Sequence, residues 1–485
     1  MTHDKVSGII NEAQAASKII LESLDKGKKI LVISHMDADG ISAAGVLGKA
    51  LFRAEANFCV RIERWLDEEV INEVYSQSGR DTLVIFTDMG SGYLDVLGAK
   101  AEGKETIILD HHQPIGKLGE SFIHVNPHLF GIDGAREVSS AGIAYFVAKS
   151  MSEKNIDLAH LAVIGALGDL QDKYDERRLG GVNELIVSDA VRSGLLSVET
   201  DLLFFGRETR PIHKALAYTT NPYVPGISGE EDGALAFLSE LKIELKRNER
   251  WRALRDLTSD EKRKLFSALH DYLISKGFRS EAAMSLIGAV YILVKEEPWT
   301  PLRDAREFAL LLNATGRMGV PGLGVAICMG DRGAAYEKAL ATLDEYRFTI
   351  TKYLKWLNEN PNRIEEWENI YILHGEKDID EKSISAISTI IAMSLPKPEK
   401  PLVAYSFMPK ERALKISARA TDSIARMGLN LGEIISLAAE KCSGIGGGHD
   451  IAAGAQVPHE QKMQFLKYVD SLVKEYLERL KKGGS

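Results

Sequence analysis

The sequence predicts an α/β protein: an N-terminal domain with a parallel sheet flanked by helices, a helical insertion, and a smaller α/β C-terminal domain joined by a long helix. Three observations predict this class. Short apolar runs rich in β-branched residues alternate with helical patterns in the first part of the chain. A charged, helix-forming stretch then interrupts them, and a second alternation begins after Pro361. The 485 residues suffice for about three domains of roughly 150 residues each.

In the N-terminal part, apolar runs predict strands over residues 29–34, 82–87 and 105–109. Helical patterns are found over residues 41–52, about 140–151 and about 159–167. This alternation is typical of βαβ units, which build a parallel sheet. Polar side chains follow each strand directly, and open α/β sheets bind ligands at the carboxyl ends of their strands. We therefore expect one site at this edge of the sheet.

Changes in composition set the expected domain boundaries. We expect the N-terminal domain over residues 1–210 with its remainder over 286–330, an insertion over 211–285, a connecting helix over 331–360 and the C-terminal domain over 361–485. The insertion is either a solvated helical hairpin that covers the core or a module that binds a partner. The C-terminal domain is expected to contain strands over 369–373, 402–407 and 413–418, with helices over 382–393, 430–441 and 460–480.

Charge and cysteine content exclude several classes of protein. The net formal charge of −9 argues against a protein that coats DNA through bulk charge, although it is compatible with a local basic groove. Cys59, Cys328 and Cys442 are far apart, so neither a disulfide framework nor a thiolate zinc site is expected. No apolar run approaches the roughly 18 residues of a membrane span. Because residues 1–16 also lack the pattern of a signal peptide, we expect a cytoplasmic protein without membrane contact.

Carboxylates and imidazoles gather in short motifs after the predicted strands. His35, Asp37 and Asp39 alternate in the loop HMDADG, and residues two apart in an extended segment share a face. The other members follow the later strands and one helix: Asp88, Asp110, His111, His112 and Asp169. Such ligands without thiolate suit Mn²⁺, or Mg²⁺ if fewer imidazoles are used. Because so many carboxylates would repel one another, we expect two divalent cations that share a bridging Asp.

The order of the motifs HMDADG, TDMG, DHH and GDLQD resembles the four motifs of the DHH phosphoesterase superfamily. The resemblance implies one Mn²⁺ bound by His35, Asp37 and Asp88. It implies a second ion bound by Asp39, Asp88, His111 and Asp169. It also implies that His112 contacts phosphate and that Asp110 orients an imidazole, whereas we expect Asp172 to be a plain surface residue. Two cations would activate water for in-line attack on phosphorus, so no serine or cysteine nucleophile is needed.

A motif in the second half of the chain predicts a contact with the nucleotide backbone. The segment LNATGRMG, residues 312–319, resembles the LNAxGRxG motif of RecJ-type nucleases. The resemblance implies that Asn313 and Arg317 lie beside the metals and hold the backbone, a role that suits the planar fork of arginine. The alternative is a glycine that ends a helix next to a surface arginine.

Two further features point to a substrate-binding C-terminal domain. Lys415, Ser417 and Arg419 alternate along a predicted strand and therefore share one face. The glycine-rich turn that follows could cradle a phosphate with its backbone N–H groups. Together with the strand, its sequence GGGH resembles the DHH-associated C-terminal domain. The resemblance implies that the terminal nucleotide or phosphate is bound by Gly447, Gly448 and His449.

The leading functional hypothesis is a Mn²⁺-dependent exonuclease that degrades single-stranded DNA, with 5′→3′ polarity favoured by the resemblance. One alternative is a 3′→5′ exonuclease or a short-oligonucleotide phosphodiesterase that acts on RNA. Another is a replisome scaffold with secondary nuclease activity. The position of the insertion resembles that in archaeal RecJ-like proteins associated with the GINS complex of the replicative helicase. The expected partners are therefore single-stranded nucleic acid and GINS, the latter through residues 211–285, in DNA replication or repair.

Overall fold

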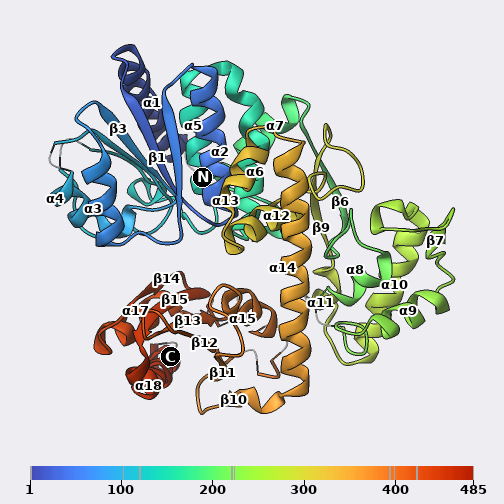
Figure 1. Cartoon of the computed structure of the whole chain (residues 1–485). Helices are drawn as coiled ribbons and strands as arrows, with labels where there is room; N and C mark the ends of the chain where they lie inside the picture. Colours follow the sequence, from blue (N-terminus) through green and yellow to red (C-terminus); the bar gives the residue numbers. More distant parts are fainter. Residues whose placement is uncertain are drawn as a thin grey trace. The chain divides into compact units, whose positions relative to one another are not determined.

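The computed structural model describes residues 3–101, 103–119, 122–219, 222, 224–392, 395–397, 399–421, 424–425 and 427–483. The chain divides into two compact units, residues 1–343 and residues 344–485. The boundary falls inside α14 (Ala334–Glu359), the long helix expected between residues 331 and 360 (Figure 1). The predicted α/β class is confirmed. Among the described residues, no helix has both the length and the apolar character that crossing a membrane requires.

The sheet of the first unit has five parallel strands in the order β2-β1-β3-β4-β5. These are β1 (Lys29–His35), β2 (Phe58–Glu63), β3 (Thr82–Thr87), β4 (Thr106–Leu109) and β5 (Phe122–Val125). Every residue of β3 and β4 is buried because helices cover both faces of the sheet (Figure 1). On one face lie α3 (Glu68–Gln77) and α4 (Leu94–Lys100). On the other lie α1 (His3–Asp25), α2 (Ala38–Arg53) and α5 (Ser140–Met151).

The connections of the sheet reverse direction between β1 and β3. From β1 the chain crosses to β2 on one side, whereas β3, β4 and β5 extend the sheet on the other side. The carboxyl ends of β1 and β3 are adjacent, since Ser34 pairs with Thr87 and the Thr87 Oγ1 donates to the Ser34 Oγ at 2.6 Å. Such a switch point is where open α/β sheets bind ligands.

Helices from later in the chain complete this unit around α2. They are α6 (Ala159–Gly168), α7 (Val182–Arg192), α12 (Ala305–Arg317) and α13 (Pro321–Cys328). Of these, α6, α12 and α13 contact α2. Most of α2 is buried as a result, from Ala38 to Leu51 with the exception of Lys49. The start of α2 is therefore fixed from several sides, which matters because it carries part of the acidic cluster.

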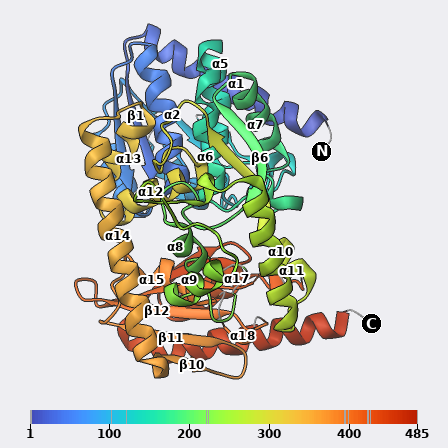
Figure 2. The same ribbon diagram turned by 90° about the vertical axis from the view of Figure 1, so that its right-hand side faces the viewer.

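The insertion grows from a two-stranded antiparallel stem, β6 (Leu196–Leu202) and β9 (Ile287–Leu293), in which Leu202 pairs with Ile287. Between them lie α8 (Ile212–Ala217), α9 (Glu231–Glu240), the hairpin β7 (Lys246–Arg247) and β8 (Arg250–Trp251), α10 (Ser259–Ser275) and α11 (Ser280–Met284) (Figure 2). Leu216, Leu238 and Leu269 belong to a buried apolar cluster of the insertion. The expected insertion over residues 211–285 lies between the two stem strands, and it packs a core of its own.

The second unit is built on a six-stranded mixed sheet in the order β10-β11-β12-β13-β15-β14. Its strands are β10 (Ile364–Glu366), β11 (Tyr371–Glu376), β12 (Leu402–Met408), β13 (Ala413–Arg419), β14 (Ile445–Gly448) and β15 (Ala452–Pro458). The end of α14 and α15 (Ile384–Ala392) pack on one face. On the other face, α17 (Leu431–Lys441) and α18 (Lys462–Gly483) cover a second apolar cluster. The expected glycine-rich turn is instead strand β14, which pairs with β15 at the edge of the sheet.

Candidate two-metal centre

The carboxyl ends of three strands bring the acidic and imidazole side chains together. His35 is the last residue of β1, Asp88 follows β3 directly, and the Asp110–His111–His112 segment follows β4. Asp88 has a positive φ of 58°, which is uncommon for a non-glycine residue and is often found at functional sites. Its backbone N–H still donates to the Leu109 carbonyl at 3.0 Å, so the turn is held by the neighbouring strand.

One donor set consists of His35, Asp37 and Asp88, whose ligand atoms all lie within 4.8 Å of one another. The His35 Nδ1 is 2.9 Å from the Asp37 Oδ2 and 3.4 Å from the Asp88 Oδ2. The His35 Nε2 donates to the Arg64 carbonyl at 3.1 Å. This contact places the proton on Nε2 and leaves the Nδ1 lone pair directed at the carboxylates, as in a metal-binding imidazole.

The HMDADG motif is extended only as far as Asp37, so the predicted alternation brings His35 and Asp37 together but is wrong for Asp39. Helix α2 begins at Ala38, and Asp37 caps it by accepting from the Gly40 N–H at 3.1 Å. Asp39 therefore lies in the first helical turn, and its carboxylate accepts from the backbone N–H groups of Ser140 and Ala141 at 2.7 and 3.0 Å. The helix start sends Asp37 and Asp39 to different donor sets.

The second donor set consists of Asp39, His111 and Asp169, again within 4.8 Å of one another, and Asp88, His111 and His112 form a further group that overlaps both sets. The His111 Nε2 is 3.2 Å from the Asp169 Oδ2 and 3.4 Å from the Asp88 Oδ1. The His111 Nδ1 donates to the Gly134 carbonyl at 2.7 Å. Asp88 thus directs one carboxylate oxygen to each donor set.

Asp88 provides the test of whether these residues suit two cations. It is 3% exposed, and neither of its carboxylate oxygens makes a hydrogen bond. A buried carboxylate without hydrogen bonds is costly in water-excluded surroundings. A cation on each side would satisfy both oxygens, with Asp88 as the bridging ligand. The oxygen and imidazole donors suit Mn²⁺ or a similar divalent ion, so the residues fit the implied metals.

The pKa values of the cluster show how strongly its carboxylates repel one another. Burial, followed by repulsion from Asp88, raises the pKa of Asp39 to about 7. Burial and repulsion from Asp39 likewise raise the pKa of Asp169 well above its usual value. Burial would raise the pKa of Asp88 as well, but the His111 and His35 imidazoles outweigh it and lower that pKa. Protons thus stabilise the cluster where cations would, so metal binding must release them.

For the two imidazoles of the donor sets, His35 and His111, nearby carboxylates outweigh the effect of burial on the pKa. Burial alone would lower the pKa of His35, but the Asp37 carboxylate outweighs it and raises that pKa. For His111, contacts with Asp88 and Asp169 outweigh burial in the same way and raise its pKa well above the usual value.

His112 and Asp110 form a dyad beside the donor sets. The His112 Nδ1 donates to the Asp110 Oδ1 at 2.7 Å, and the Asp110 Oδ2 accepts from the Ser91 N–H at 2.9 Å. Burial opposes the charge on both groups, but their mutual attraction outweighs it, raising the pKa of His112 and lowering that of Asp110. The His112 side chain is 41% exposed, so a charged imidazole can meet a ligand while Asp110 fixes its ring.

Sequence reasoning missed the residues that hold this dyad and His111. The Asn126 Nδ2 donates to the Ser91 Oγ at 2.9 Å and to the His112 carbonyl at 2.8 Å. The Gln171 Nε2 donates at 2.9 Å to the Gly134 carbonyl that also accepts from His111. Only the place of Ser91 directly after the motif TDMG and of Gln171 inside GDLQD could have signalled these roles.

The LNATGRMG motif lies against the HMDADG motif. Its first part belongs to α12, and the Asn313 Oδ1 accepts from the Ala38 N–H at 3.0 Å. At Gly316 a Cβ would lie 1.7 Å from the Met36 carbonyl oxygen, so only glycine permits this approach. Asn313 therefore holds the HMDADG segment, here called the metal loop, in place. Arg317 is the half-buried last residue of the helix.

Asp172 is not the surface residue that the sequence suggested. It is 2% exposed, and its Oδ2 lies 2.8 Å from the Arg177 Nη2 and 2.9 Å from the Arg306 Nη2. Two arginines compensate the buried charge, so this carboxylate is a structural clamp between the GDLQD motif and α12.

The C-terminal candidates belong to the second unit. Lys415, Ser417 and Arg419 lie on one face of β13, opposite Ile416 and Ala418. Ser417 is buried, and its Oγ is 2.9 Å from the Ser388 Oγ of α15. The Arg419 Nε donates to the Thr389 Oγ1 at 2.8 Å. Ser417 is therefore a packing contact, whereas Lys415 and Arg419 are half-buried.

The glycine candidates lie on the edge strand of the same sheet. Gly447 pairs with Gly454 and Gly448 with Ala453 of β15. His449 follows β14, and its N–H donates to the Ala452 carbonyl at 2.8 Å in the turn between the two strands.

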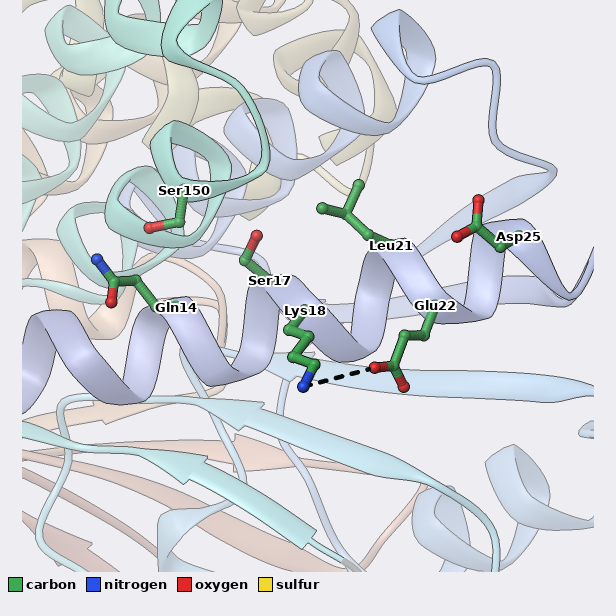
Figure 3. A pocket seen from close by; sticks show the side chains of 7 residues that line it. All are labelled: Gln14, Ser17, Lys18, Leu21, Glu22, Asp25 and Ser150. Atoms are coloured by element: carbon green, nitrogen blue, oxygen red, sulfur yellow. Dashed lines mark ion pairs between the residues drawn. The ribbon is translucent and has the colours of Figure 1, made fainter.

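A shallow depression elsewhere in the first unit offers no comparable chemistry. It is lined by α1 and by Ser150 of α5, and it contains the ion pair of Lys18 and Glu22 at 3.9 Å (Figure 3). Both of these side chains are largely exposed, so they hold nothing at a defined point.

The parallel sheet with acidic and imidazole donors at its carboxyl edge defines the class of protein as an α/β protein with a candidate metal-binding site. Family models match three segments: the N-terminal domain of the DHH family over residues 29–166, the DHH-CID domain over 204–287 and the DHHA1 domain over 369–475. An uncharacterized protein of Methanocaldococcus jannaschii is 32% identical over 475 residues, covering 97% of this chain and 99% of that relative. The chain belongs to the DHH family of phosphoesterases and is RecJ-like.

More distant relatives agree with this assignment. The single-stranded-DNA-specific exonuclease RecJ of Bacillus subtilis is 29% identical over 171 residues, which are 34% of this chain and 22% of that relative. The structure of Thermus thermophilus RecJ with Mn²⁺ matches 96% of this chain and 55% of that one, with a TM-score of 0.58 and 16% identity. The structure of CDC45 from Entamoeba histolytica matches 95% of this chain and 99% of that one, with a TM-score of 0.65 and 13% identity. The two structural matches show a shared fold.

Proposed function

We propose that this protein is a phosphodiesterase that uses two divalent cations, preferably Mn²⁺, to release nucleotides from single-stranded DNA. The observation that carries the proposal is Asp88, whose two buried carboxylate oxygens lack hydrogen bonds and face two separate donor sets. The name of the B. subtilis relative, a single-stranded-DNA-specific exonuclease, supports the choice of substrate.

The chain's own residues would divide the work as follows. Two cations bound around Asp88 would supply an activated water and neutralise charge on the phosphate oxygens. The protonated His112, fixed by Asp110, would contact phosphate and donate a proton to the departing oxygen. Arg317 would bind the nucleotide backbone through its planar fork, while Asn313 keeps the metal loop in register. Lys415, Arg419 and the residues Gly447, Gly448 and His449 would bind the terminal nucleotide or phosphate.

We propose 5′→3′ polarity, and a digestion panel tests it. Strands of DNA and RNA labelled at either end are incubated with Mn²⁺, Mg²⁺ or a chelator. The proposal expects early release of a labelled 5′ mononucleotide from DNA with Mn²⁺ and no release with chelator. Release of the 5′ label only at the end of digestion would refute the polarity and leave the metal chemistry standing.

The same panel separates the alternative substrates. Faster turnover of RNA, or early release of the 3′ label, would favour the 3′→5′ enzyme. Faster turnover of dinucleotides than of long strands would favour a short-oligonucleotide phosphodiesterase. The long strand is the substrate we propose, so the comparison should use dinucleotides and long strands at equal concentrations of strand ends.

We also propose that the insertion, residues 211–285, binds the GINS complex in DNA replication or repair. An independent core on a two-stranded stem suits a module that offers its surface to a partner. A scaffold with secondary nuclease activity is the second candidate. The full chain and its Asp88→Asn variant are compared for binding to purified GINS. Equal binding with lost cleavage would separate the two activities, and no binding by either protein would refute the partner.

A further inference from the structure

The turn that follows β2 lies directly beside the metal centre. In the parallel pairing of β1 and β2, His35 is opposite Glu63. The carbonyl oxygen of the next residue, Arg64, accepts a hydrogen bond from the His35 Nε2–H at 3.1 Å. The side chains of Arg64 and Trp65 are therefore carried by the backbone that orients a metal-binding imidazole.

These two side chains form a stacked pair. The Arg64 guanidinium lies 4.6 Å from the centroid of the Trp65 ring, and both residues are half-buried. The segment is anchored on the far side, since Leu66 is 5% exposed in the core and the Asp67 carboxylate accepts from the Val70 N–H at 2.8 Å to cap α3. The pair is thus held at a fixed place on the carboxyl edge of the sheet.

We infer that Arg64 and Trp65 form the nucleotide-binding site of the metal centre, in which Trp65 stacks on the base and Arg64 contacts an adjacent phosphate. The inference rests on the proposed function and names its substrate class more closely: a strand with unpaired bases, rather than a simple phosphate ester. Aromatic rings bind every base through its π-face, so such a site tolerates any sequence. Arginine stacks on aromatic rings and pairs with phosphate through the same planar group.

The structure also allows base binding to be separated from metal binding. The contact with His35 uses the backbone carbonyl of Arg64, so removing either side chain leaves that hydrogen bond in place. A residue that served only to orient His35 would not need an aromatic neighbour. The Trp65→Ala variant should therefore keep its affinity for Mn²⁺, as measured by the paramagnetic resonance signal of the free ion.

The test compares two single strands of equal length, one intact and one whose terminal nucleotides at both ends lack their bases. With saturating Mn²⁺, Trp65→Ala should lower kcat/KM on the intact strand by about 5- to 150-fold, the range expected for loss of one stacked base. On the abasic-ended strand the same variant should differ from the wild type by less than about twofold. Trp65→Phe, which keeps an aromatic face, should restore most of the activity.

Trp251→Ala is the matched control, since Trp251 is an exposed tryptophan of the insertion with Lys246 at 4.6 Å from its ring. It should leave both strands unaffected. Equal loss on both strands in Trp65→Ala, or no loss on the intact strand, would overturn the inference. If the wild type cuts neither strand, the proposed function fails, and fluorescence anisotropy of the two strands with Ca²⁺ still decides the inference. Weaker binding of only the intact strand by Trp65→Ala would support it.

Discussion

Asp39 gives the metal-free protein a pH dependence that can be measured. Its carboxyl group is fully buried, and burial together with repulsion from Asp88 raises its pKa from 3.8 to about 7. A folded group with a raised pKa holds a proton that the unfolded chain has already released. Its contribution to stability is therefore complete below about pH 3.8 and is lost as the pH rises towards 7. A pKa change of this size corresponds to about 4 kcal/mol.

Neighbouring groups act in the same direction. The pKa of Asp169 is raised by burial and by Asp39, so its contribution is also lost as the pH rises. Burial alone would lower the pKa values of His35 and His111, but Asp37 beside His35 and Asp88 beside His111 outweigh burial, and both pKa values are raised. The stability that these two imidazoles contribute is therefore lost as the pH rises above 6.5. The pKa of Asp88 is lowered, which affects stability only below pH 3.8. From pH 5 to 8 these groups should thus make the metal-free protein steadily less stable, whereas four histidines whose pKa values burial lowers, His124, His128, His160 and His213, act in the opposite sense below pH 6.5.

The assay is thermal unfolding with chelator and with saturating Mn²⁺ between pH 5 and 8. The wild-type Tm should fall by several degrees with chelator, and Mn²⁺ should abolish the fall because cations replace the protons. Asp39→Asn should show a shallower fall. Asp189→Asn is the control: Asp189 is also buried, but Lys149 and Tyr145 outweigh burial and lower its pKa, so its titration lies outside this range. A slope in Asp39→Asn equal to that of the wild type would refute the reasoning.

Three further substitutions test the site. Asp88→Asn keeps the shape of the shared ligand but removes its charge, so Mn²⁺-dependent cleavage should drop by at least about 100-fold in the digestion panel; a smaller loss would argue against a bridging role. Gly316→Ala forces a Cβ against the Met36 carbonyl, and urea unfolding should show a loss of about 1–3 kcal/mol or more. An unchanged urea midpoint would contradict the close contact between Gly316 and the Met36 carbonyl. Ser91→Ala removes the hydroxyl that accepts from Asn126. The kcat should fall about 10-fold while the affinity for Mn²⁺ stays constant. Weaker metal binding would contradict a role of Ser91 in holding the dyad alone.

The parts of the site that could be predicted are those encoded by local patterns. Apolar runs followed at once by acids and histidines placed Asp88 and His111 at strand ends, because the sheet edge follows from the alternation alone. Asp37 and Asp39 were both predicted in the site, but the alternation that holds for His35 and Asp37 is wrong for Asp39. The sequence does not show that Asp37 begins a helix, since aspartate caps helices and fills loops alike.

What could not be predicted depends on contacts between distant segments. Gln171 reaches His111 only through the carbonyl of Gly134, 37 residues away along the chain. Asp172 looks like a surface residue until Arg306 is brought to it from α12, 134 residues away. The glycine-rich stretch of Gly446 to Gly448 suggested a turn, but backbone pairing with β15 decides that it is a strand. In each case the tertiary neighbour supplies the missing information.

Helix α12 explains how a large insertion can be built into this family without disturbing the metal centre. Near its start, Glu307 accepts from the Glu208 N–H and from the Thr209 Oγ1, both at 2.5 Å, and so fixes the base of the insertion. Two turns later, Asn313 holds the Ala38 N–H of the metal loop. One buried helix thus anchors both regions, and the insertion adds a core of its own rather than borrowing from the catalytic one. Changes on the surface of the insertion should therefore leave the geometry of the donor sets around Asp88 unaltered.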